Sequence, residues 1–246
     1  MTDKKYDLSI IVACYNEGSY LKDNIREIEE TLKRTVYSYE IIIIDDCSQN
    51  KTGNVIKKIC QGKDNYKCYF HQENVGRGGT VKEGLLNSNG KYAGFLDIDL
   101  EVGARYISSM IRSLERGTDV ATAYRYYDLA QILQLREIFR NFLSYIYRFI
   151  VRGYLGLKLS DTETGYKFFN MRTMKGLIKK TRDDAWFWDT EIMALSYYNQ
   201  KKIEEIPCLF LRRSDKKSTV KLFRDVYQYL VAIRKFKKSY KKGIYD

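Results

Sequence analysis

The sequence of 246 residues predicts an α/β fold in which a mostly parallel sheet is flanked by helices. Two short runs, 8–13 and 40–44, are continuously apolar and rich in β-branched residues. Such runs are typical of strands buried on both faces of a parallel sheet. Between them, leucine and isoleucine recur at helical spacing over 21–32. This order of strand, helix and strand favours parallel strands joined by crossover helices.

Helical and strand-like patterns keep alternating further along the chain. The only proline is Pro207, and no Gly/Ser-rich or repetitive stretch marks a linker, so residues 1–246 are expected to form a single domain. The remaining elements are expected as a helix near 55–59, strands at 67–71, 92–96 and 120–124, and helices at about 77–88 and 104–116.

Charge and apolar content limit the classes of function. The net charge of +12 is concentrated late in the chain: residues 201–246 carry 14 Lys and Arg against 5 Asp and Glu, whereas residues 1–100 carry 14 against 15. A basic end suits nucleic acid or an anionic membrane surface, and charge alone does not choose between them. No apolar run approaches the roughly 18–20 residues that span a bilayer, so membrane contact is expected to be peripheral or through a membrane partner.

The cysteines and the N-terminus favour a cytoplasmic protein. The five cysteines lack Cys-x-x-Cys spacing and have no cluster of histidines nearby, so reduced thiols are expected rather than a zinc site or disulfides. Residues 1–7 are polar and a strand-like run follows at once, so no signal sequence is expected.

The most informative motif is a pair of carboxylates, Asp97 and Asp99, directly after the apolar run 92–96. A strand sends alternate side chains to the same side, so both can bind one divalent cation. Carboxylate oxygens suit Mg²⁺ or Mn²⁺, which keep coordination positions open for substrate phosphates. The same spacing also occurs in ordinary surface turns, so the assignment depends on the rest of the chain.

Polar residues follow three other predicted strands as well. In open α/β sheets, ligands gather outside the carboxyl ends of the strands, so these side chains are expected to converge. Acids packed together without cations would raise one another's pKa, so their expected ligand is the cation-bound diphosphate of a sugar nucleotide. In chain order the residues are Tyr15, Asn16, Glu17, Asp45, Asp46 and Arg125.

Six short motifs occur in a fixed order through nearly the whole chain. They are residues 12–17 (VACYNE), 44–48 (IDDCS), 71–79 (HQENVGRGG), 97–101 (DIDLE), 161–167 (DTETGYK) and 205–207 (EIP). Together with Arg125 and Tyr126, this series resembles inverting family 2 glycosyltransferases of the GT-A fold. Within that family it is most similar to the dolichol-phosphate mannose synthase-like, or polyprenyl-phosphate glycosyltransferase, branch.

The resemblance implies a fold and an activity. The fold would be GT-A with C-terminal interfacial helices. Its residues 1–125, approximately, would form the nucleotide-sugar-binding half, and about 126–246 the acceptor- and membrane-facing half. The activity would be metal-dependent, inverting transfer of a sugar from a GDP- or UDP-linked donor to a dolichyl or undecaprenyl phosphate.

The resemblance also implies site residues. Glu101 stands where relatives often carry glutamine, so the choice between Mg²⁺ and Mn²⁺ stays open, and Thr219 stands where many carry lysine. The implied donor-binding residues are Tyr15, Asn16, Glu17, Asp45, Asp46, Gly76, Arg213, Ser218 and Lys221. The implied metal ligands are Asp97 and Asp99, which also serve catalysis, with Glu101 as a third ligand.

The acceptor decides whether a general base is needed. A lipid phosphate arrives ionised, whereas a sugar hydroxyl needs a carboxylate within hydrogen-bond reach. Asp189 is the first candidate base because the corresponding region of many family members lines the acceptor side, and Glu191 is the next. A simple capping role for Asp189 is an equal alternative.

Residues 129–157 bear on the same choice. Apolar residues form a helical stripe there, and arginines recur every four residues on another face. This pattern suits either a core-packed helix or an interfacial helix whose arginines bind a lipid phosphate. Arg140 and Ser144 match the Arg-x-x-x-Ser portion of the family pattern, and Arg125 is placed to help bind the acceptor.

Four features also have plain structural interpretations. Gly76 and its neighbours suit a tight turn as well as a phosphate cradle. Residues 186–188 (WFW) suit core packing better than sugar stacking. His71, the single histidine, suits a structural role better than acid/base work, and 235–242 suits a solvated face.

Three functions compete. The first is a membrane-associated transferase acting on a polyprenyl phosphate, peripheral on the cytoplasmic face of a membrane. The second is a family 2 transferase that extends a capsule, lipopolysaccharide or protein-linked glycan. The third, a catalytically silent sugar-nucleotide or nucleic-acid binding module, suits the basic end but not the acids at the strand ends. The expected partners are therefore a nucleotide sugar, a lipid phosphate or glycan acceptor and a membrane surface, and no nucleic acid.

Overall fold

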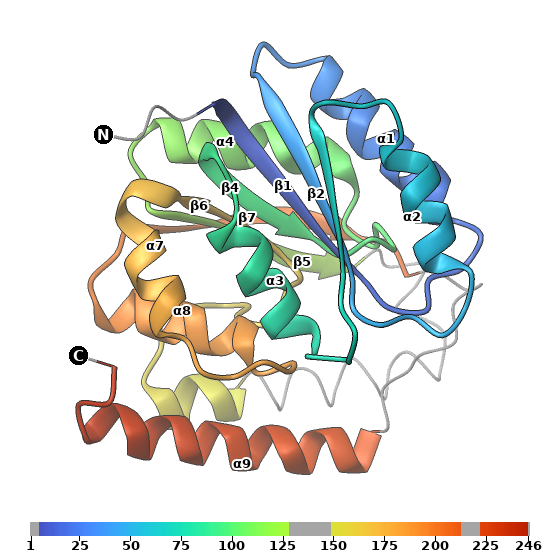
Figure 1. Cartoon of the computed structure of the whole chain (residues 1–246). Helices are drawn as coiled ribbons and strands as arrows, with labels where there is room; N and C mark the ends of the chain where they lie inside the picture. Colours follow the sequence, from blue (N-terminus) through green and yellow to red (C-terminus); the bar gives the residue numbers. More distant parts are fainter. Residues whose placement is uncertain (1–4, 128–148, 213–221, 246) are drawn as a thin grey trace.

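A computed structural model describes residues 5–127, 149–212 and 222–245, which are arranged around one seven-stranded sheet (Figure 1). The strands run in the order β3-β2-β1-β4-β6-β5-β7. The first four strands along that order pair in parallel, so the predicted, mostly parallel sheet is confirmed. These four are β3 (Tyr66–Phe70), β2 (Tyr39–Asp45), β1 (Tyr6–Cys14) and β4 (Gly90–Leu96).

The other side of the sheet contains one antiparallel strand that the sequence did not predict. This strand, β6 (Tyr166–Asn170), pairs antiparallel with both β4 and β5 (Val120–Tyr127). Beyond it, β7 (Ile203–Phe210) pairs in parallel with β5 and forms the sheet edge. An edge strand tolerates a residue without a backbone N–H, which is why β7 can hold Pro207.

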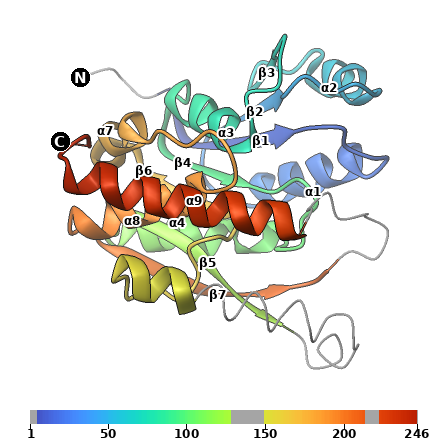
Figure 2. The same ribbon diagram turned by 90° about the horizontal axis from the view of Figure 1, so that it is seen from below.

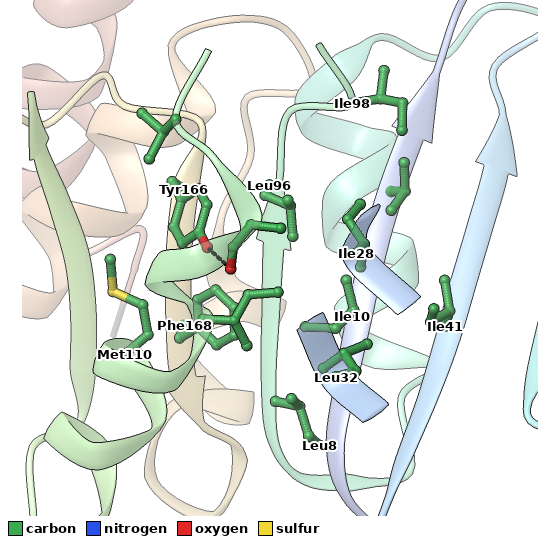
Figure 3. Close-up of a cluster of buried hydrophobic side chains, with 14 of the residues drawn as sticks. Leu8, Ile10, Ile28, Leu32, Ile41, Leu96, Ile98, Met110, Tyr166 and Phe168 are labelled. Carbon is green, nitrogen blue, oxygen red and sulfur yellow. Dashed lines mark hydrogen bonds between the residues drawn. The ribbon is translucent and has the colours of Figure 1, made fainter. Parts of the chain in front are cut away.

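Helices cover both faces of the sheet, which explains the continuous apolar runs. In β1, Ile10 packs into the hydrophobic cluster on one face and Ile11 into the cluster on the other. Figure 3 shows the first cluster, where Ile28 and Leu32 of one helix meet Ile10. The first face carries α1 (Leu21–Lys33), α2 (Thr52–Cys60) and α4 (Ile107–Glu115), and the second carries α3 (Arg77–Leu86), α7 (Met171–Lys180) and α8 (Trp188–Tyr198).

A further layer lies on the outer side of α8. Helix α9 (Leu222–Lys241) and a helical segment at 149–155 pack there around a third hydrophobic cluster (Figures 1 and 2). In this cluster Phe236 contacts the rings of Phe187 and Tyr245. Helix α9 is thereby attached to the loop that precedes α8.

The helices expected from the sequence occur near their predicted positions. The one expected at 104–116 begins with a 3-10 turn (Ala104–Tyr106) before α4. Of the segment 129–157, residues 128–148 lie outside the described part and 149–155 are helical. Among the described residues, no helix combines the length and the apolar character needed to cross a membrane.

Candidate functional site

The candidate site lies where β1, β2 and β4 end. These strands are parallel, and Cys14 at the end of β1 pairs with Asp45 at the end of β2. On its other side β1 pairs with β4, where Ile11 lies opposite Phe95. The polar segments that follow the three strands therefore share one edge of the sheet, as the sequence predicts.

Hydrogen bonds join the segments after β1 and β2. The backbone N–H of Asn16 donates to Ser48 Oγ at 2.8 Å, and Asn16 Oδ1 accepts from the backbone of Gln49 at 2.8 Å. Ser48 in turn donates to the carboxylate of the buried Asp45. Asn16 adopts φ +54°, a left-handed conformation that asparagine tolerates better than most residues. Asp45 is thus held in place beside the segment predicted to bind the nucleoside.

The remaining residues of this segment are tied to the same loops. The carboxylate of Glu17 accepts from the hydroxyl of Tyr20, and its backbone carbonyl accepts from Asn50 Nδ2 at 3.2 Å and from Thr52 Oγ1 at 3.2 Å. Tyr15 is exposed. The predicted donor-binding role of Tyr15, Asn16 and Glu17 stays a prediction.

Asp46 organises the glycine-rich loop. Its buried carboxylate accepts from the backbone N–H of Val75 at 2.8 Å and of Gly76 at 3.0 Å. His71 Nδ1 lies 2.8 Å from the same carboxylate, and His71 Nε2 lies 3.0 Å from Glu83 Oε2. The Gly76 amide is therefore paired with a protein carboxylate in this structure. His71 lies between Asp46 and Glu83 and so helps to fix the loop, which agrees with its structural interpretation.

The glycines of this loop allow close packing against the segment before α8. Gly76 has φ +93°, and a Cβ there would overlap the carbonyl oxygen of Asp184. A Cβ at Gly78 would lie 2.6 Å from the carbonyl oxygen of Ala185. Gly79 N–H donates to the Asp184 carbonyl at 3.0 Å. The predicted tight turn around Gly76 explains why glycine is needed at these positions.

The two central carboxylates lie on a tight turn after β4. Asp97 N–H donates to the carbonyl of Gly165 at 2.9 Å, and Leu100, with φ +53°, donates its N–H to the Asp97 carbonyl at 3.1 Å. The backbone N–H of Glu101 points to Asp99 Oδ1 at 3.4 Å. Gly165 belongs to the motif 161–167, so two of the predicted motifs meet at Asp97.

Alternating charges extend from Asp97 into the protein. Arg77, the first residue of α3, donates through Nε at 3.0 Å and Nη2 at 2.7 Å to Asp97 Oδ1, and through Nη1 to Asp189 Oδ2. Lys167, which is fully buried, donates to Asp189 Oδ1 at 2.7 Å. Both oxygens of the buried Asp189, predicted as a base, thus accept from cations.

Burial and ion pairing together shift the pKa of both cations, in opposite directions. Burial disfavours the charged guanidinium of Arg77, but attraction to Asp189 and Asp97 outweighs it and raises the pKa. Burial lowers the pKa of Lys167, although Asp189 opposes that shift. The sequence alone predicted no role for Arg77 or Lys167. The available signal was a lone basic residue inside each of the motifs 71–79 and 161–167.

The aromatic residues 186–188, at the start of α8, differ in their surroundings. Phe187 and Trp188 are buried, as their core-packing interpretation predicts, whereas Trp186 is 52% exposed. The guanidinium carbon of Arg77 lies 5.4 Å from the ring centroids of both Trp186 and Phe95. Trp186 therefore borders the Asp97 site.

Arg125 is held by the acidic motif that precedes β6. It donates to the buried Asp161 through Nε at 2.7 Å and Nη2 at 2.9 Å, and the pair raises the pKa of Arg125 against the effect of burial. Glu205 accepts from the backbone N–H groups of Ser160 and Asp161 at 2.8 and 2.9 Å. The motifs 161–167 and 205–207 thus contact each other. The other predicted acceptor and loop residues lie outside the described residues: Arg140, Ser144, Arg213, Ser218 and Lys221.

The donor chemistry of the Asp97 turn fits a divalent cation shared with substrate. Asp97 and Asp99 offer the carboxylate oxygens that Mg²⁺ and Mn²⁺ prefer, and the Asp97 side chain is 46% exposed. Within the part of the chain that the structure describes, no three His, Cys, Asp or Glu side chains gather so that they could hold a metal. This arrangement suits a cation bound by two carboxylates and by phosphate oxygens of a substrate better than a cation bound by protein ligands alone. Glu101 as a third ligand stays a prediction.

We expect His71 to make stability depend on pH. Burial lowers its pKa, but hydrogen bonds to Asp46 and Glu83 outweigh burial and raise the pKa above 6.5. A raised folded-state pKa gives stability that is fully present below the unfolded value and lost as pH rises through the folded value. The stability advantage of wild type over His71→Gln should therefore shrink from about pH 6 to about pH 9 in urea unfolding. Since the chain has one histidine, a constant difference would contradict this.

Comparisons with known proteins agree with this geometry. The sequence profile described as Glycosyl transferase family 2 matches residues 9–177. Glycosyltransferase AglD of Haloferax volcanii is 25% identical over 223 residues, which cover 89% of this chain and 35% of that protein. Dolichyl-phosphate beta-glucosyltransferase of Dictyostelium discoideum is 28% identical, covering 94% of this chain and 77% of that protein. The chain thus spans about a third of AglD and about three quarters of the second relative.

Among solved structures, the glucosyl-3-phosphoglycerate synthase of Mycobacterium tuberculosis in complex with Mn²⁺, UDP-glucose and phosphoglyceric acid has a TM-score of 0.70. It is 13% identical, and the match covers 94% of this chain and 80% of that one. At this identity the likeness concerns the fold, and it confirms the predicted GT-A class.

Proposed function

The chain belongs to glycosyl transferase family 2 and is a glycosyltransferase, and from this premise we propose that it transfers a sugar from a nucleotide sugar to a polyprenyl phosphate with inversion. The observation that carries the proposal is the position of Asp97 and Asp99 at the carboxyl edge of the sheet, beside a buried chain of ion pairs. Relatives named dolichyl-phosphate beta-glucosyltransferase support a lipid phosphate acceptor and make glucose the first sugar to test.

The donor would lie across the ends of β1, β2 and β4. In this proposal Asp45 and the segment 15–17 hold the nucleoside, and Asp97 and Asp99 hold Mg²⁺ or Mn²⁺ against the diphosphate. When bound, the cation neutralises the negative charge that develops on the departing diphosphate. The hydrogen bonds that fix Asp45 and the Asp97 backbone keep both groups in position before the donor arrives.

The transfer requires no general base for this acceptor. An ionised oxygen of the lipid phosphate attacks the anomeric carbon, and a new carbon–oxygen bond forms. The bond from that carbon to the β-phosphate oxygen breaks, and the nucleoside diphosphate leaves with the electron pair. Attack from the opposite face inverts the anomeric centre.

The surroundings of Asp189 support this assignment. Arg77 and Lys167 bind both of its oxygens, so Asp189 orients Arg77 in this proposal and removes no proton. A sugar hydroxyl would instead need a carboxylate free to accept a proton. The alternative function, extension of a glycan, is therefore an outcome of the test rather than a second proposal.

We also propose that the enzyme works peripherally on the cytoplasmic face of a membrane. The helical segment 149–155 exposes apolar side chains, Phe149 at 70%, beside the exposed Arg152. It adjoins α9, where Lys237 donates to the carbonyl of Tyr154. Apolar and basic groups together favour an anionic lipid surface. None of the five cysteines, which all lie in the described part of the chain, forms a disulfide, and this supports a reducing compartment.

The direct test is an assay with purified protein, Mg²⁺ or Mn²⁺, a panel of UDP- and GDP-sugars and a short polyprenyl phosphate. We expect nucleoside diphosphate release that depends on the lipid phosphate, together with a glycolipid product. Hydrolysis without glycolipid, combined with transfer to a glycan, would replace the lipid acceptor by the alternative. No nucleotide release with any donor would refute the proposal.

A further inference from the structure

Arg77 is hydrogen-bonded to the carboxylate of Asp97, which is a proposed ligand of the cation. Two of its nitrogens, Nε and Nη2, converge on Asp97 Oδ1 at 3.0 and 2.7 Å. The other oxygen, Oδ2, faces Gly165 so closely that a Cβ there would overlap it. The side chain of Asp97 is therefore already neutralised in the free enzyme.

The charges along this network balance. Lys167 and Arg77 are positive, and Asp189 and Asp97 are negative, with each acid paired to a cation. A bare divalent cation added beside Asp97 would bring two positive charges next to Arg77, whose side chain is only 13% exposed, and this repulsion opposes binding of the cation alone. A cation that arrives with a nucleotide diphosphate brings at least as much negative charge as positive.

The two ends of the guanidinium have different surroundings. Nη1 is bound to Asp189, whose side chain is almost fully buried, whereas Nε and Nη2 bind the half-exposed Asp97. One ring beside the guanidinium, Phe95, is buried, and the other, Trp186, faces solvent. Arg77 is thus anchored at one end by a buried acid and paired at the other end with an acid that is about half exposed.

We propose that Arg77 is the resident counter-cation of Asp97 and that it passes its Nε and Nη2 hydrogen bonds to the donor diphosphate when the cation binds. Capture of Mg²⁺ or Mn²⁺ by the enzyme then depends on the nucleotide. The inference rests on the proposed function in one respect, because it takes Asp97 as a metal ligand. It adds a donor-binding role for Arg77 and an order of binding.

Calorimetric titration of Mn²⁺ tests this order. Wild type should bind Mn²⁺ alone weakly, and saturating UDP or GDP should tighten binding by at least about 10-fold. Arg77→Gln frees Asp97, so Mn²⁺ alone should bind about 10-fold more tightly than to wild type, and the nucleotide should add less. Arg77→Lys, which keeps the charge, should resemble wild type. If Arg77→Gln fails to fold, the fluorescence of Trp186 in wild type still tests whether its contact with Arg77 changes.

A structural ion pair that never opens gives the opposite results. Arg77→Gln would then leave the affinity for Mn²⁺ alone unchanged, and the nucleotide would tighten Mn²⁺ binding as much in the variant as in wild type. Either result overturns the inference.

Tryptophan fluorescence gives a second readout, because Trp186 contacts Arg77 and Trp188 is fully buried with its indole N–H donated to Thr181. With diamagnetic Mg²⁺, UDP plus Mg²⁺ should change the emission of wild type, and Mg²⁺ alone should not. Trp186→Phe should abolish the change. An equal change with Mg²⁺ alone would contradict the inference.

The two proposals fail separately. A coupled binding of metal and nucleotide without any glycolipid product would leave the role of Arg77 intact and refute the lipid acceptor. A glycolipid product from an enzyme that binds Mn²⁺ tightly without nucleotide would support the lipid acceptor and refute the role of Arg77.

Discussion

Replacing Asp99 by asparagine should lower the turnover of sugar transfer by at least about 100-fold, because the turn after β4 loses one of the two proposed carboxylate ligands of the cation. Asparagine has nearly the same shape, and its side-chain oxygen can still face the backbone N–H of Glu101. The thermal midpoint should therefore change little. Nucleoside diphosphate release at saturating donor, with Mg²⁺ and with Mn²⁺, measures the effect.

Asp23→Asn is a matched control for the loss of one carboxylate charge. Asp23 lies on α1, is 64% exposed and pairs only with its helical neighbour Arg26 among the ion pairs of the described residues. This variant should turn over at the wild-type rate. An Asp99→Asn enzyme as active as the control would remove the metal site from the proposal.

Gly165→Ala should reduce transfer by at least about 10-fold through displacement of Asp97. The new methyl group would overlap Asp97 Oδ2 and lie 2.6 Å from Arg77 Nη2. Since the displaced atoms are the ends of side chains rather than backbone, the protein should remain folded, but the carboxylate must rotate away. Affinity for Mn²⁺ together with UDP should fall in the same variant, and calorimetry measures that fall.

Gly176→Ala provides the control for this substitution. Gly176 lies in α7, and nothing lies within 4 Å of the position its Cβ would take. Alanine at this helical position should preserve activity and slightly raise stability. Unchanged metal affinity in Gly165→Ala would show that Asp97 does not need its present position.

The strands were predictable from sequence where burial is complete. The runs 8–13 and 40–44 pack on both faces of the sheet, so every residue of each run except Ser9 and Glu40 is apolar. The positions of Asp97 and Asp99 followed from the same logic, because they come directly after such a strand. Local sequence was sufficient for these features.

The ion pairs were not predictable, because each joins distant parts of the chain. Arg77 and Asp189 are 112 residues apart, and Arg125 and Asp161 are 36 residues apart. By itself, a lone arginine or lysine in a sequence indicates solvent exposure, and only the assembled sheet shows that Lys167 is buried against Asp189. The sequence offered a base or a capping role for Asp189 and an acceptor-binding role for Arg125, and the structure adds an ion-pair partner for each.

The antiparallel strand β6 has a consequence for how the protein is made. On the ribosome, β1 to β4 emerge first, but the edge of β4 that β6 covers stays unpaired until residue 170 has been synthesised. Among the described strands, β5 pairs with β6 and β7, so it too must wait for both. Unpaired strand edges in a nascent chain invite association with other chains, and such long-range pairing is slow. Synthesis of the last third of the chain therefore sets when the sheet that carries the candidate site is complete.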